Sequence, residues 1–167
     1  MHVSFLTEEQ RGLRDEIGAK LIARGENVAV AESTTGGLIS AVLLSYPGAS
    51  KYYTGGGVLY TLRSRTDLAG VSADEYVNYR GTTAEMLLSV ANAMRVKLGA
   101  TWCIAESGLA GPTGSRFGAP AGRTTVAVVG PVARSTVFET GDADREANMV
   151  AFTTLALRYL REALNEA

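Results

Sequence analysis

Short apolar segments alternate with amphipathic segments along the whole chain, and glycines separate them. Alternating strands and helices predict a central mixed sheet covered by helices on both faces, a three-layer α/β/α sandwich. A length of 167 residues predicts a single domain over 1–167. The expected helices cover residues 7–24, 38–45, 62–69, 83–98 and 144–164, and the expected strands cover 27–32, 52–60, 101–106, 124–129 and 136–140.

Several reactive residue types are rare in this chain. It contains one His, His2, one Cys, Cys103, and three Lys against thirteen Arg. So few His and Cys argue against a Ser-His-Asp or Cys-His triad and against a zinc site, and we expect no metal. Cys103 lies in the apolar stretch TWCIA and is expected to be a buried core thiol. No disulfide within the chain can form.

The charge and apolar patterns restrict location and partners. The net charge is −1 and the arginines are dispersed, so we expect no nucleic-acid partner. No run of 18 apolar residues and no basic leader occurs, which predicts a cytoplasmic protein without a membrane partner.

Two loops rich in glycine and hydroxyl groups follow expected strands. Residues 32–37 (ESTTGG) precede a helix, and residues 107–114 (SGLAGPTG) follow the strand 101–106. Each loop has a structural explanation, with Ser33 or Thr34 as a helix cap and a turn at 111–112. The functional alternative is an anion or oxyanion site at the start of the helix. Neither loop has a Rossmann or Walker pattern, and we expect no cofactor.

Read together with the segment between them, these loops resemble the C-terminal domain of the CinA family, the nicotinamide-nucleotide amidases. The order and spacing of the motifs hold from about residue 8 to residue 164. Because the chain starts near the first helix of that domain, it resembles the stand-alone form. The matching segments are AESTTGG (31–37), PGAS (47–50), GGGVLYTLRSRTDLAGV (55–71), SGLAGP (107–112), APAGRTTVAV (119–128) and GDADRE (141–146).

The resemblance implies an activity and a set of site residues. The activity is hydrolysis of the carboxamide of nicotinamide mononucleotide to the acid and ammonia, with Ser33 as nucleophile and Tyr60 assisting. The family's lysine base falls at position 65, where this chain has Arg65. The resemblance also implies a homo-oligomer, at least a dimer. The implied substrate-binding residues are Thr34, Thr35, Gly36, Gly37, Glu106, Ser107, Gly108 and Gly111.

Arginine cannot replace that lysine as the base for the serine. A guanidinium remains charged and has no lone pair with which to take the serine proton. Arg65 could instead lower the pKa of a neighbour or hold a phosphate. Two replacement bases are open, Glu106 and a Tyr60 phenolate beside Arg65. The structural explanation is favoured for each: Glu106 as a carboxylate that hydrogen-bonds the loop, and Tyr60 as a core or strand-surface tyrosine. Arg63, Arg123 and Arg145 are further candidates for holding a phosphate.

Three functions therefore remain open from the sequence. The first is an active amidohydrolase, with amides near Gly36 and Gly37 as oxyanion donors and Tyr60 or Glu106 assisting Ser33. The second is a catalytically inactive homologue that binds the nucleotide as a sensor or subunit. The third is a different reaction on another small substrate, with Glu106 as acid or base.

Overall fold

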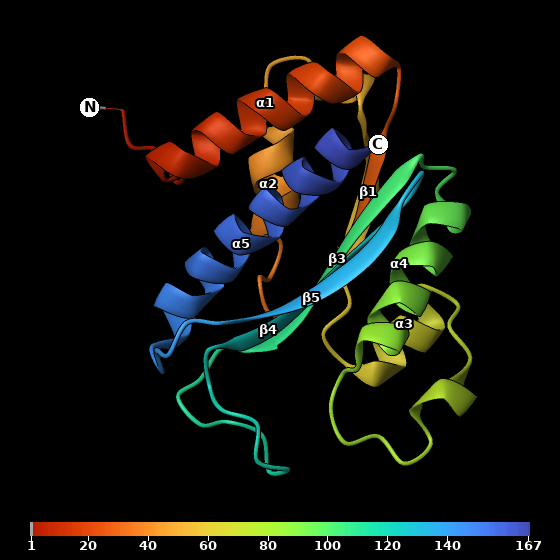
Figure 1. The fold of residues 1–167 in the computed structure, drawn as a ribbon, viewed down its shortest axis with the longest axis vertical. Coiled ribbons are helices and arrows are strands. Elements are labelled where there is room, and N and C mark those ends of the chain that lie inside the picture. Colours follow the sequence, from red (N-terminus) through yellow and green to blue (C-terminus); the bar gives the residue numbers. More distant parts are fainter. Residues whose placement is uncertain (1) are drawn as a thin grey trace.

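The computed structural model describes residues 2–167 and contains one five-stranded sheet with helices on both faces (Figure 1). The sheet order is β2-β1-β3-β4-β5. The helices are α1 (Glu8–Arg24), α2 (Leu38–Leu44), α3 (Leu62–Asp67), α4 (Ala84–Lys97) and α5 (Arg145–Glu166), with 3-10 turns η1 (Ala49–Lys51) and η2 (Ala73–Tyr76), and the strands are β1 (Val28–Glu32), β2 (Tyr53–Val58), β3 (Trp102–Leu109), β4 (Arg123–Val129) and β5 (Ala133–Glu139).

The sheet is mixed because its connections differ in length. β1 pairs in parallel with β2 and β3, and helical segments make those crossovers. β4 pairs antiparallel with β3 and with β5, and a short turn joins β4 to β5. As a result, the carboxyl ends of β1, β2 and β3 lie at one edge of the sheet, which is where ligands bind in many α/β folds.

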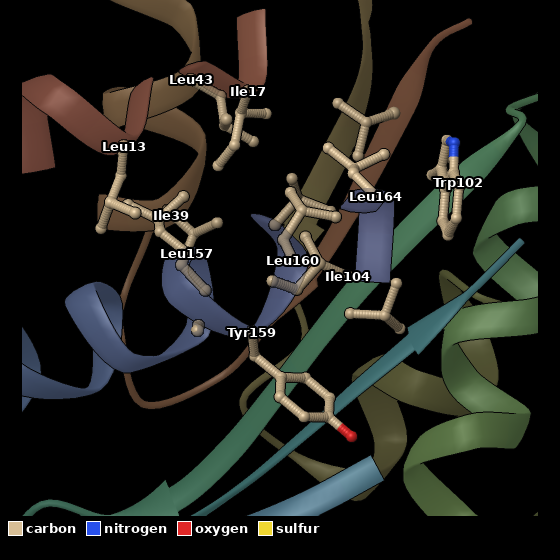
Figure 2. Packing of buried hydrophobic residues seen from close by; sticks show 14 of the residues in the cluster. Leu13, Ile17, Ile39, Leu43, Trp102, Ile104, Leu157, Tyr159, Leu160 and Leu164 are labelled. Atoms are coloured by element: carbon tan, nitrogen blue, oxygen red, sulfur yellow. The ribbon is translucent and has the colours of Figure 1, made fainter. Parts of the chain in front are cut away.

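Side chains alternate between the two faces of the sheet, and each face has its own core. On one face, Val28, Val30 and Ile104 pack with residues of α1, α2 and α5. Figure 2 shows this core, in which Leu157 and Leu160 of α5 lie among residues of α1, α2 and the sheet. On the other face, small residues of β1, β3 and β4 pack against α4. The three-layer sandwich expected from the sequence is therefore confirmed.

The helix ends follow local sequence signals. Thr7 caps α1, where Thr7 and Gln10 form a reciprocal capping box, and Gly25 ends this helix with a φ of 64°. Asp144 caps α5 by accepting a hydrogen bond from the amide of Ala147. These ends agree with the predicted helices to within a residue or two.

Three details differ from the expected elements. β3 continues to Leu109, although residues 107–109 are part of a predicted loop, because they pair with Arg123–Thr125 of β4. β5 begins at Ala133 rather than at residue 136. The two 3-10 turns are not predicted by the hydrophobic pattern.

Cys103 is fully buried as expected. Across residues 2–167, none of the helices combines the length and apolar character needed to cross a bilayer.

Candidate functional site

The parallel pairing of β1 and β3 brings the two predicted loops together. Ala31 lies opposite Ala105 in the register, and Ser33 and Ser107 each lie two residues further along their chains. Ala31 and Ala105 both belong to the core on the α4 face. Strand periodicity therefore places Ser107 on this same face, toward α3 and the segment that precedes α4.

Glu106 holds the first loop against the sheet. Its fully buried carboxylate accepts hydrogen bonds from the amide of Thr35 at 2.9 Å and from the hydroxyl of Thr34 at 2.5 Å. It also accepts from the Thr124 hydroxyl at 2.8 Å, from the Thr35 hydroxyl at 3.1 Å and, at 3.4 Å, from the amide of Ser33. Burial raises the pKa of Glu106, and these hydrogen bonds partly oppose that rise.

This arrangement decides between the two interpretations of Glu106. The carboxylate bonds the loop backbone and the threonine hydroxyls, and no hydrogen bond joins it to the Ser33 hydroxyl within residues 2–167. Thr34 also accepts a 2.6 Å bond from the amide of Gly108, which ties the two loops to each other. Glu106 is therefore a carboxylate that positions the loop.

Glu32, one residue before Ser33, occupies the N-terminus of α2. Its carboxylate accepts from the amides of Gly37 at 2.8 Å, Ile39 at 3.1 Å and Ser40 at 3.0 Å. The amide of Gly36 donates to the carbonyl of Ser33. The expectation that amides near Gly36 and Gly37 serve as oxyanion donors is therefore wrong, because these donors already have partners inside the fold.

Ser33 itself is positioned but not activated. The residue is 6% exposed, and its hydroxyl has no hydrogen-bond partner among residues 2–167. The backbone amide of Thr34, which follows it, has no acceptor in the same part of the chain. No described side chain is placed to take the Ser33 proton.

Arg65 is buried beside the end of β3. This residue of α3 is 3% exposed, and its guanidinium donates to the Ser107 hydroxyl at 2.9 Å, to the Thr82 hydroxyl at 3.0 Å and to the Leu59 carbonyl at 3.5 Å. All three acceptors are neutral. None of the ion pairs within residues 2–167 includes Arg65, so a buried positive charge lies at the site without a protein counter-ion.

A chain of hydroxyl groups extends from Arg65. The Thr82 hydroxyl lies 3.1 Å from the Ser107 hydroxyl and 3.1 Å from the Tyr79 hydroxyl. All three residues line a pocket of about 230 Å³. Its wall also contains three arginines and an aromatic ring, contributed by Arg80, Arg116, Arg123 and Phe117.

Phe117 and two arginines form the exposed part of this pocket. The guanidinium carbons of Arg80 and Arg116 each lie 4.8 Å from the centroid of the Phe117 ring, a distance typical of cation–π contacts. Arg123, in contrast, is paired with Glu139 at 2.9 Å. The pocket therefore has an exposed rim that is cationic and aromatic, while Arg65 lies behind two of its lining hydroxyls, those of Ser107 and Thr82.

Tyr60 does not pair with Arg65. It is 58% exposed, and its hydroxyl accepts a 3.3 Å bond from Arg145 at the start of α5. Arg145 also donates to the carbonyl of Gly111 at 2.6 Å. The alternative of a Tyr60 phenolate beside Arg65 finds no support, because the Tyr60 hydroxyl accepts from Arg145 while Arg65 donates to Ser107 at the end of β3.

The remaining candidates are placed as follows. Gly111 has a φ of 110° and packs so closely that a Cβ would lie 2.3 Å from the carbonyl of Ala143. Arg63 is exposed on α3 and pairs with Asp67. Lys20 and Lys97 lie on helices as expected, and Lys51 is exposed in η1.

Several pocket residues are not among those predicted from the sequence: Tyr79, Arg80, Thr82, Arg116 and Phe117. Arg116 and Phe117 follow the second glycine loop directly, which places them near the site. The segment 79–82 carries no motif, and only the crossover from α3 to α4 brings it to Ser107.

Comparison with known proteins agrees with this architecture. The profile of the CinA C-terminal domain matches residues 10–164. A CinA-like protein of Desulfosudis oleivorans is 35% identical over 163 residues, which are 96% of this chain and 39% of that protein. One from Anaeromyxobacter dehalogenans is 36% identical over 154 residues, 91% of this chain and 37% of the relative. This chain thus spans about two fifths of the length of these relatives.

Solved structures share the fold. The competence-damaged protein (CinA) superfamily protein of Klebsiella pneumoniae superposes with a TM-score of 0.88 at 26% identity, covering 95% of this chain and 99% of that one. The competence/damage inducible protein CihA of Agrobacterium tumefaciens gives a TM-score of 0.87 at 28% identity, covering 98% of this chain and 99% of that one. On the matched profile, the relatives and the shared fold, the chain belongs to the CinA family, through the C-terminal domain of that family.

Proposed function

We propose that this CinA-family chain binds a pyridine mononucleotide in the pocket between the end of β3, the segment before α4 and the loop that follows residue 112. The observation that supports this most is the buried guanidinium of Arg65, which lies behind the lining hydroxyls of Ser107 and Thr82 and, within residues 2–167, bonds only neutral oxygens. An isolated buried charge is costly, and an anionic ligand would offset that cost.

The exposed part of the pocket supports the same ligand class. Arg80 and Arg116 can bind a phosphate through charge-assisted hydrogen bonds, and Phe117 offers an apolar surface to a flat ring. A pocket of about 230 Å³ with these groups suits a small phosphorylated heteroaromatic ligand. Binding is favoured over turnover, because the resemblance puts a guanidinium where the family has its base, and a guanidinium cannot accept the serine proton.

A second candidate function is hydrolysis of the carboxamide, with Ser33 as nucleophile. One observation favours it: the Ser33 hydroxyl follows β1 directly and, within residues 2–167, has no partner that would compete with a substrate. The free amide of Thr34 would be the oxyanion donor for this reaction. Loss of a general base reduces rates by about 10²- to 10⁴-fold, so residual activity would be slow.

Calorimetric titration tests the binding proposal. We expect nicotinamide mononucleotide or its acid to bind at or below millimolar concentration, and Arg80→Gln to weaken that binding because a phosphate contact is lost. Arg161→Gln, which removes a charge on α5, is the matched control. If neither nucleotide binds at millimolar concentration, the proposal is wrong.

Ammonia release from nicotinamide mononucleotide tests the second candidate. Slow release that disappears in Ser33→Ala and rises in Arg65→Lys would support hydrolysis, because a lysine amine can lose its proton and accept that of the serine. Release equal to that of Ser33→Ala would exclude Ser33 catalysis while leaving the binding proposal intact.

A further inference from the structure

We infer that the pocket selects the carboxylate form of its ligand over the carboxamide, with the acid group seated against the hydroxyls of Ser107 and Thr82 in front of Arg65. This inference rests on the proposed binding of a pyridine mononucleotide. It adds that the acid, which is the product of deamidation, binds more tightly than the amide. The chain would then act as a receptor for the acid.

The hydrogen bonds around Arg65 determine which protons face the pocket. The Thr82 hydroxyl has one proton and two lone pairs, and it meets Arg65, Tyr79 and Ser107. Since Arg65 can only donate, Thr82 accepts from one of the two neighbouring hydroxyls and donates to the other. Whichever direction holds, either Ser107 or Tyr79 keeps a proton that no protein acceptor in this network takes.

That free proton makes the pocket wall a hydrogen-bond donor. Ser107 and Tyr79 both line the pocket, so the proton is available to a ligand there. Arg65 has five N–H groups and makes three hydrogen bonds, to Leu59, Thr82 and Ser107. The lining hydroxyls therefore offer a hydrogen-bond donor to the pocket, and the positive charge of Arg65 lies directly behind them.

The nearest buried carboxylate is occupied by other hydrogen bonds. Glu106 directly precedes Ser107, but its two oxygens accept from Ser33, Thr34, Thr35 and Thr124, and within residues 2–167 it forms no ion pair with Arg65. The positive charge behind Ser107 and Thr82 is therefore not neutralised by Glu106.

A carboxylate suits this environment better than a carboxamide. Both of its oxygens accept, and its charge is opposite to that of Arg65. A carboxamide offers one acceptor and no charge, so its N–H groups gain nothing from the positive charge of Arg65. Because hydrogen bonds to charged groups contribute about 1.5–3 kcal/mol, we expect the acid to bind roughly 10- to 100-fold more tightly than the amide.

The test compares three compounds on the wild-type chain by calorimetry. Nicotinamide mononucleotide carries phosphate without carboxylate, nicotinate mononucleotide carries both, and nicotinate riboside carries carboxylate without phosphate. We expect the acid nucleotide to bind at least about tenfold more tightly than the amide. Equal affinities, or a preference for the amide, would overturn the inference and leave the binding proposal standing. Absence of binding by either nucleotide would overturn both.

Variants then locate the acid group. Arg65→Gln should lower the affinity for nicotinate mononucleotide and nicotinate riboside by about tenfold, and should change that for nicotinamide mononucleotide by less than about threefold. Arg161→Gln, which removes a charge on α5 that is paired with Glu16, is the control and should change none of them. If Arg65→Gln weakens both nucleotides equally, Arg65 binds the phosphate and the inference is wrong.

Two further variants distinguish a loss of the ligand contact from a loss of folding. Arg65→Lys keeps the charge and should keep most of the preference for the acid. Ser107→Ala changes a half-buried residue at the end of β3 and should reduce the preference for the acid. A Ser107→Ala chain that melts normally and keeps the full wild-type preference would contradict the role of this hydroxyl.

Discussion

The Oγ of Ser107 accepts a hydrogen bond of 2.9 Å from Arg65, whereas the residue before it, Glu106, binds the loop at 33–35. Neighbouring residues on a strand point to opposite faces, so one short segment of β3 serves two sides of the site. Glu106 fixes the position of the serine loop. Ser107 lines the pocket and accepts a hydrogen bond from the buried Arg65 behind it.

Replacing Glu106 should reduce stability. Glu106→Gln exchanges one acceptor oxygen for an amino group that faces donors such as the Thr124 hydroxyl. We expect the free energy of unfolding to fall by about 1–3 kcal/mol, measured by denaturant titration. Glu162→Gln, at an exposed ion pair with Arg134, should change it by less than about 1 kcal/mol. Similar losses for both variants would contradict the proposed role of Glu106.

Tyr52 should make stability depend on pH in the alkaline range. Burial raises the pKa of Tyr52 to about 12, and its hydroxyl donates to the carbonyl of Leu43. The folded chain then holds this proton more tightly than the unfolded chain, whose pKa is 10.0. The contribution of Tyr52 to the free energy of unfolding is therefore fully present below pH 10 and is lost as the pH rises toward 12. Tyr52→Phe should flatten that decline in urea titrations.

Tyr60→Phe is the matched control for this experiment, because the Tyr60 side chain is exposed. We expect the free energy of unfolding of Tyr60→Phe to fall with rising pH as steeply as that of the wild type. If that of Tyr52→Phe falls equally steeply, a group other than Tyr52 causes the loss of stability.

Cys103 should report unfolding through its reactivity. The thiol is fully buried and burial raises its pKa, so little thiolate forms in the native chain. We expect very slow reaction with Ellman's reagent at neutral pH and fast reaction in denaturant. Since this is the only cysteine, the signal has a single source. Rapid reaction of the native chain would contradict the burial of β3.

Two glycine-to-alanine changes should act in opposite directions. At Gly111, a Cβ would lie 2.3 Å from the carbonyl of Ala143, and the φ of 110° disfavours alanine, so Gly111→Ala should destabilise by more than about 1 kcal/mol. Gly12 lies within α1 with open space around it, so Gly12→Ala should stabilise by about 0.5–1 kcal/mol. Thermal melting of both variants measures the difference, and shifts of the same sign would contradict it.

The sequence predicts the layers and most of the elements because periodicity reflects burial directly. It misplaces the end of β3, because the segment Ser107–Leu109 has the composition of a loop and is held in the sheet only by pairing with β4. The motifs predict that Ser33, Arg65 and Ser107 share one site, and the structure joins Arg65 to Ser107, but the motifs do not reveal the other partners of these residues. The contact of Thr82 with Ser107 spans 25 positions and depends on how α3 and α4 pack, which local patterns do not record.

The carboxylate of Glu32 at the start of α2 has a consequence for how ligand preference can change. Its hydrogen bonds to Gly37, Ile39 and Ser40 are made entirely within the fold, so they tie the residue before Ser33 to the start of α2. Changes of ligand preference are then expected at side chains of the pocket wall outside this loop, such as Arg80 and Arg116. Specificity in this domain can thus diverge without refolding its loop.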